Sequence, residues 1–111
     1  REFIYSDDAA DACVFLLENI DFVNLYSKDE VEIRNTHLNI GSGVDISISE
    51  LAEMIKKIVG YKGSFIFNEN KLEGSMVKIT NPTKLNTLGW KYKVKLKDGI
   101  EKTYHWYLNN I

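Results

Sequence analysis

The stretch NIGSGVDISISELAEMI, residues 39–55, constrains the local fold more than any other part of the chain. Ser47 and Glu50 have the spacing of a capping box, in which each side chain accepts a hydrogen bond from the other residue's backbone N–H. Apolar residues then recur at helical spacing as far as Gly60, a residue type that readily ends helices. We therefore predict a helix from Ile48 to Val59 with one buried stripe.

The two glycines before this helix raise the question of a phosphate-binding loop. Gly41 and Gly43 match the first two positions of the dinucleotide fingerprint G-x-G-x-x-G, but the third position is Ile46. No lysine of the Walker type precedes the helix either. The pattern favours a structural turn, and a loop that approaches a ligand without holding a diphosphate remains the alternative.

The rest of the chain is typical of one small α/β domain, with short strands and three to four helices, in 111 residues. Asp7 and Asp8 suit a helix N-terminus, and the apolar spacing after them predicts a helix to Asn19. Pro82 fits the first turn of a short helix, and Asn81 is predicted to be the cap of that helix. The remaining expected elements are strands at 3–5, 36–40 and 64–68 and a last helix over 96–109.

Composition excludes several function classes. The net charge of -2 argues against a nucleic-acid partner, and no apolar run reaches the length of a membrane span. Cys13 lies on the expected apolar face of its helix and is interpreted as an inert core thiol. His37 and His105 lack metal-ligand spacing, so both are interpreted as structural. We therefore expect no metal site.

Two basic residues lie next to segments that could form a binding site. Arg1 precedes the first expected strand, and Lys78 follows the irregular stretch LEGSMV. Such a pair suits a phosphate group, because both side chains donate charged hydrogen bonds. Two solvated surface charges are the alternative.

Four segments resemble extended short-chain dehydrogenase/reductases that act on nucleotide sugars. They are REFIYSDDAA, NIGSGVDISISELAEMIKKIVGYKG, KLEGSMVKITNPTKLNTLGWK and LKDGIEKTYHWYLNN, in the family's order and over almost the whole chain. The second segment is similar to the form found in the GDP-L-fucose synthase group. That group epimerises GDP-4-keto-6-deoxymannose at C3 and C5 and reduces C4 with NADPH.

The resemblance covers only the C-terminal substrate-binding domain of this family, residues 1–111 here. It implies that the N-terminal Rossmann domain, with the catalytic residues and the NADP site, lies outside this chain. The start at Arg1 rather than Met suggests a piece of a longer protein. This chain is then expected to hold no catalytic, cofactor-binding or metal-binding residue. A cytoplasmic homodimer is expected for the full-length enzyme.

In this family, Arg1 matches an arginine that contacts the GDP part of the substrate, and Lys78 matches a lysine at the diphosphate. The loop before Lys78 departs from the family pattern K-P-D-G-T-P-R-K, so a related sugar such as a GDP-deoxyheptose is an open alternative. The departures are Leu72, Glu73, Ser75, Met76 and Val77, with Asn81 in place of a frequent aspartate. A non-catalytic nucleotide-binding module and an interaction module anchored by Tyr104, Trp106 and Tyr107 also stay open.

Overall fold

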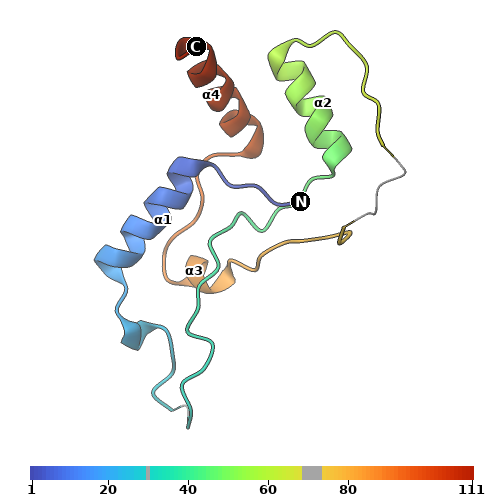
Figure 1. Ribbon diagram of the computed structural model, residues 1–111. Coiled ribbons are helices and arrows are strands. Elements are labelled where there is room, and N and C mark those ends of the chain that lie inside the picture. Colours follow the sequence, from blue (N-terminus) through green and yellow to red (C-terminus); the bar gives the residue numbers. More distant parts are fainter. Residues whose placement is uncertain (30, 69–73) are drawn as a thin grey trace.

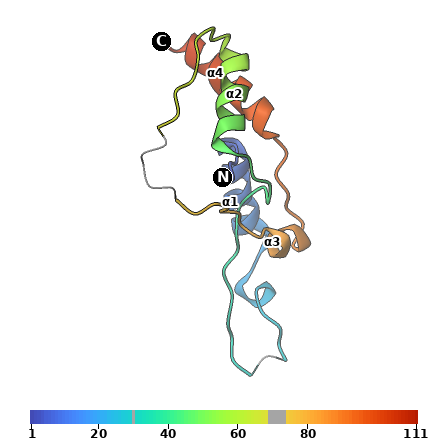
Figure 2. The same cartoon turned by 90° about the vertical axis from the view of Figure 1, so that its right-hand side faces the viewer.

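The computed structural model describes residues 1–29, 31–68 and 74–111, and its helices are joined by long irregular segments (Figure 1). These residues form four α-helices, α1 (Ser6–Asn19), α2 (Ile48–Val59), α3 (Thr83–Thr87) and α4 (Leu96–Asn109), and one 3-10 helix, η1 (Phe22–Asn24). Helices α2 and α4 pack side by side, whereas α1 and α3 lie together in a second lobe (Figures 1 and 2).

Local signals set the ends of α2 as predicted. The Ser47 hydroxyl accepts the Glu50 N–H at 3.1 Å, and the Glu50 carboxylate accepts the Ser47 N–H at 3.0 Å. Gly60 ends the helix in the left-handed region with φ 72°.

The bounds predicted for α4 are also confirmed. At α3 the Asn81 side chain accepts the Thr83 N–H at 3.0 Å, but Pro82 holds the capping position that was predicted for Asn81.

A small core holds the second lobe together. Ala12, Leu85 and Trp90 are buried, and partly buried apolar side chains surround them. The Trp90 indole N–H donates to Asp11 Oδ2 at 2.8 Å, and Lys93 Nζ approaches the same oxygen at 3.0 Å. The hydrogen bond from Trp90, followed by that from Lys93, lowers the pKa of the Asp11 carboxyl.

The predicted buried face of α1 was partly wrong. Cys13 is exposed and Leu17 is 88% exposed, so Cys13 is not a core thiol. Asp8 is buried instead, and its carboxylate accepts the backbone N–H groups of Lys93 and Val94 at 3.1 and 2.8 Å. Asp8 therefore joins α1 to the segment before α4. It lies with Asp7 in the first turn of α1, as predicted, but Tyr5 holds the capping position, with no side-chain hydrogen bond to the helix end.

The three predicted strands were wrong for the residues that the structure describes. Segments 3–5, 36–40 and 64–68 are irregular, and the bridge found among the described residues pairs Glu2 with Asp45. A strand exists only when its backbone N–H and C=O groups join a ladder with a neighbour. These segments have the composition of strands but no ladder within the described chain, so the expected α/β character reduces to helices.

The chain is flat and open. Its radius of gyration is 18.2 Å, against about 13 Å for a compact domain of this length. Its accessible surface is 8855 Å², against roughly 6,300 Å² for a folded monomer of this mass.

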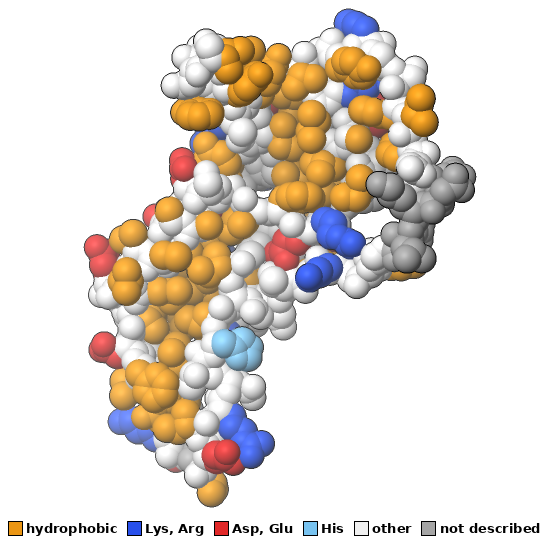
Figure 3. All heavy atoms as spheres, viewed as in Figure 1, with side chains coloured by type: hydrophobic (Ala, Val, Ile, Leu, Met, Phe, Trp, Pro, Cys, Tyr) orange, Lys and Arg blue, Asp and Glu red, His pale blue; other side chains and the backbone are white. Residues whose placement is uncertain are grey.

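Apolar side chains cover much of the visible face over both lobes (Figure 3). A groove of about 580 Å³ lies between the α2–α4 pair and residues 3–6. Within the described ranges no helix has both the length and the hydropathy to cross a membrane.

Candidate functional site

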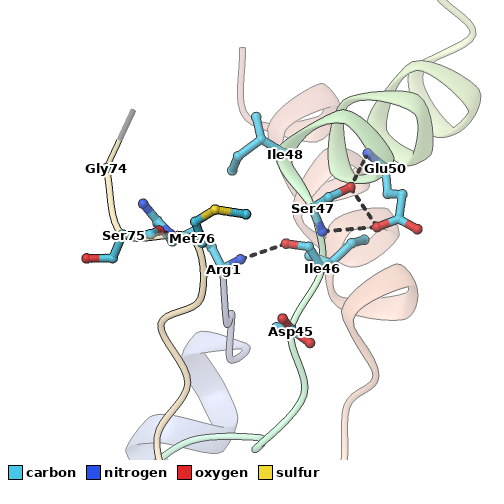
Figure 4. Close-up of a pocket in the computed structure, with 9 residues that line it drawn as sticks. All are labelled: Arg1, Asp45, Ile46, Ser47, Ile48, Glu50, Gly74, Ser75 and Met76. Atoms are coloured by element: carbon cyan, nitrogen blue, oxygen red, sulfur yellow. Dashed lines mark hydrogen bonds between the residues drawn. The ribbon is translucent and has the colours of Figure 1, made fainter. Parts of the chain in front are cut away.

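A pocket of about 480 Å³ lies where the start of the chain, the entry to α2 and residues 74–76 meet (Figure 4). Arg1 lies between the α2 side and the side formed by 74–76. The lining residues are Arg1, Asp45, Ile46, Ser47, Ile48, Glu50, Gly74, Ser75 and Met76. The pocket therefore contains one of the two residues predicted to bind phosphate.

Backbone and side-chain bonds fix Arg1 in the wall of this pocket. Its backbone exchanges two hydrogen bonds with Ile46, at 2.6 and 2.9 Å. Its guanidinium donates from one nitrogen to the Ser75 carbonyl at 2.6 Å. A guanidinium has five N–H donors, so others remain for a ligand. A methyl group at Gly74 would lie 3.0 Å from the other terminal nitrogen, so this glycine leaves room for the arginine.

The lining of the pocket also includes negative groups. Asp45 and Glu50 supply two carboxylates, and hydrogen bonds from the Ser47 hydroxyl and then its backbone N–H lower the pKa of the Glu50 carboxyl. Carboxylates accept hydrogen bonds and repel phosphate. The pocket is thus chemically suited to a group that offers N–H or O–H donors, with an anion held at its Arg1 edge.

Lys78 does not line this pocket and is exposed. It lies on the segment 75–80, which is bonded to the start of the chain on both sides of the lysine. Arg1 binds the carbonyl of Ser75, and Glu2 accepts the N–H of Thr80 at 2.7 Å. The structure therefore brings the segment that carries Lys78 alongside Arg1. Figure 3 shows basic side chains gathered in the middle of the molecule, between the two apolar surfaces.

Glu2 is a residue that the sequence analysis missed. Its carboxylate accepts the Gly43 N–H at 2.7 Å and lies within hydrogen-bond distance of the Ser42 and Thr80 hydroxyls. Burial would raise the pKa of this carboxyl, but the hydrogen bonds from Thr80, Gly43 and Ser42 together outweigh burial and hold the pKa below its ordinary value. The signal available in the sequence was its place beside Arg1 in the R-E-F motif.

The glycine turn does not fit a dinucleotide diphosphate. The Gly43 N–H, which such a loop would turn toward a phosphate, points at the chain's own Glu2 carboxylate. A side chain at Gly41 would overlap the Thr80 hydroxyl and the Glu2 carboxylate, so there is no open space on that side of the turn. Gly43 has φ 70°, which explains the second glycine as a turn residue.

The remaining candidate groups from the sequence form no second site. Among the described residues no cluster of three or more His, Cys, Asp or Glu side chains could hold a metal ion. Tyr104 and Tyr107 line the apolar groove, and Trp106 is 67% exposed. These aromatic residues belong to the open apolar surface rather than to the pocket at Arg1.

Comparisons with known proteins match the whole chain. It is 45% identical over 111 residues to GDP-L-fucose synthase 1 of Arabidopsis thaliana and 39% identical over 115 residues to GDP-L-fucose synthase of Escherichia coli. A solved GDP-6-OMe-4-keto-L-xylo-heptose reductase from C. jejuni matches with a TM-score of 0.92 at 44% identity, covering 100% of this chain and 31% of that one. The two sequence matches cover 100% and 99% of this chain. No family model matches it.

The chain is similar in sequence and in fold to the C-terminal part of GDP-sugar enzymes of the extended short-chain dehydrogenase/reductase type. Within that class it is similar to GDP-L-fucose synthases, so the resemblance read from its sequence is confirmed. The chain spans about a third of the length of these relatives, 31% and 33%.

Proposed function

We propose that residues 1–111 form the C-terminal substrate-binding domain of an NADPH-dependent enzyme that converts GDP-4-keto-6-deoxymannose to GDP-L-fucose. The observation that carries this proposal is the match over the whole chain to GDP-L-fucose synthases at 45% and 39% identity. The longer protein would supply a Rossmann domain, the NADP site and the catalytic groups. A GDP-mannoheptose C4 reductase with NADP bound, 46% identical to this chain, supports that cofactor for the full-length enzyme.

The pocket at Arg1 fits the proposed role of this domain. Arg1 and Lys78 would neutralise the diphosphate, and the acceptors Asp45 and Glu50 would receive donor groups of the nucleotide or the sugar. Binding energy from the nucleotide, which does not react, would hold the sugar in place for reaction on the other domain. This domain would therefore bind and orient the substrate without taking part in proton or hydride transfer.

A GDP-heptose reductase is the second candidate. The solved GDP-heptose reductases are 44% and 46% identical to this chain, so identity does not separate the two sugars. Of the residues that depart from the family pattern, Ser75 and Met76 line the pocket and would contact the sugar end, whereas Leu72 and Glu73 lie outside the described residues. A cytoplasmic location and a homodimer stay predictions for the full-length protein.

The two candidates differ in the chemistry they require. Epimerisation removes protons at C3 and C5, on either side of the C4 carbonyl, before NADPH reduces that carbonyl, whereas a simple reductase leaves those protons in place. The full-length protein is incubated with NADPH and GDP-4-keto-6-deoxymannose in deuterated water. NADPH oxidation with deuterium at both carbons supports the fucose synthase. Oxidation of NADPH with a GDP-4-keto-heptose and no deuterium supports the heptose reductase, and no oxidation with either sugar contradicts both.

A further inference from the structure

The Glu2 carboxylate joins three segments that are far apart in the sequence. One oxygen accepts the Gly43 N–H at 2.7 Å, and the other accepts the Thr80 N–H at 2.7 Å. The Thr80 hydroxyl lies 2.9 and 2.8 Å from the two oxygens. A single side chain thus ties the start of the chain to the glycine turn and to the end of segment 75–80.

Two neighbouring residues hold the two ends of that segment. The Arg1 guanidinium donates to the Ser75 carbonyl at 2.6 Å, and Glu2 binds both the backbone and the hydroxyl of Thr80. Lys78 lies between these two attachments and is exposed. Within residues 1–29, 31–68 and 74–111 its ammonium group has no hydrogen-bond or ion-pair partner. Its position therefore depends on how the backbone of the segment is held.

Glu2 itself is unsuited to phosphate. An ionised carboxylate only accepts hydrogen bonds, and its two oxygens are already used by donors from inside the chain. Gly41 approaches so closely that a side chain there would overlap the carboxylate and the Thr80 hydroxyl. The cluster is thus closed to a ligand and acts on its surroundings through the backbone.

We propose that Glu2 is a positioning residue, which holds the segment carrying Lys78 alongside Arg1 so that both cations reach the diphosphate of the GDP-sugar. This inference rests on the proposed function, because it assigns Lys78 and Arg1 the phosphate. Glu2→Gln keeps one acceptor oxygen and removes the charge, so the side chain can no longer accept the N–H groups of Thr80 and Gly43 together. The attachment of the segment to Glu2 is then weakened, because any hydrogen bond that remains is a neutral one.

The test is a double-mutant cycle on GDP affinity, measured by calorimetry in the full-length protein. Glu2→Gln is expected to weaken GDP binding about tenfold, the loss typical of a charged hydrogen bond. In a Lys78→Ala background the same change is expected to cost less than about twofold, because residues that act as a unit are not additive. Glu53→Gln, which removes one exposed carboxylate of α2 outside the pocket, is the matched control and should leave GDP affinity unchanged.

Each outcome decides between explanations. If Glu2→Gln weakens GDP binding equally in the wild-type and Lys78→Ala backgrounds, Glu2 has a general structural role. That result would overturn the positioning role but leave the proposed function standing. Absence of GDP binding by the unmodified protein would overturn the proposed function together with this role. If Glu2→Gln does not fold, Thr80→Val and Thr80→Ser take its place. The valine removes the donor hydroxyl and should weaken GDP binding, whereas the serine keeps it and should bind normally; equal affinity in both would contradict the proposal.

Discussion

Replacing Gly41 by alanine should destabilise the chain through the side chains that face this glycine. The added methyl would overlap the Thr80 hydroxyl and the Glu2 carboxylate, and would lie 3.1 Å from Glu2 Cδ. Both side chains would have to move, which breaks the hydrogen bonds between them. Each hydrogen bond to a charged group contributes about 1.5–3 kcal/mol, so losing one or two of them is expected to cost about 1.5–6 kcal/mol.

Gly60→Ala is the matched control for this prediction. Gly60 occupies a turn with φ 72°, but a methyl there meets nothing within 4 Å. Its cost is therefore the backbone strain alone, about 1 kcal/mol. Urea unfolding followed by helical circular dichroism gives the free energy of unfolding for both variants. A Gly41→Ala cost no larger than that of Gly60→Ala would refute the closed cluster.

A second background isolates the cause. Truncating the carboxylate with Glu2→Ala removes one of the two side chains that the methyl group would overlap. It also frees the Thr80 hydroxyl from its hydrogen bonds to Glu2, so that this hydroxyl can rotate away from the methyl group. In that background Gly41→Ala should cost less than about 1 kcal/mol, because the two residues share one cluster. A cost of the same size in both backgrounds would mean that Gly41 does not act through Glu2.

Three further predictions concern the cap, the core and the isolated chain. Ser47→Ala should lower the free energy of unfolding by about 1 kcal/mol in urea titrations, since it removes the acceptor of the Glu50 N–H. Because the pKa of Asp11 is lowered in the folded state, the hydrogen bonds of its carboxylate to Trp90 and Lys93 stabilise the fold at pH values above the ordinary pKa of an aspartate. This stabilisation is lost as the pH falls through the lowered pKa. The difference in free energy of unfolding between wild type and Asp11→Asn should therefore be constant above about pH 5 and shrink in acid. The 111-residue chain alone should show no saturable change in NADPH fluorescence and no reductase activity, because its glycine turn is closed by Glu2.

Local signals in the sequence were enough to place helices but not their tertiary partners. The ends of α2 follow from Ser47, Glu50 and Gly60, all of which act within one or two turns of the helix. The buried face of α1 did not follow, because Asp8 is buried by backbone donors 85 and 86 residues away. The predicted strands failed for the same reason, since a ladder depends on a partner that local composition does not specify.

The candidate site, like the fold, could be predicted from the sequence only in part. Arg1 could be predicted because a family resemblance assigns it to the nucleotide, and the structure places it in a pocket. Glu2 could not be found from spacing, because its partners lie 41 and 78 residues away. Lys78 stays a predicted ligand, carried on the segment that those contacts hold.

The central claim is that this domain binds the GDP part of a GDP-sugar through Arg1 and Lys78. The most direct measurement is calorimetric titration of GDP into the full-length protein and its Arg1→Ala and Lys78→Ala variants, with NADPH titrated in parallel. Each variant should lose about 1.5–3 kcal/mol of GDP binding, roughly 10- to 150-fold in affinity, and keep its affinity for NADPH. Equal GDP affinity in all three proteins would contradict the account and assign both side chains to the solvated surface.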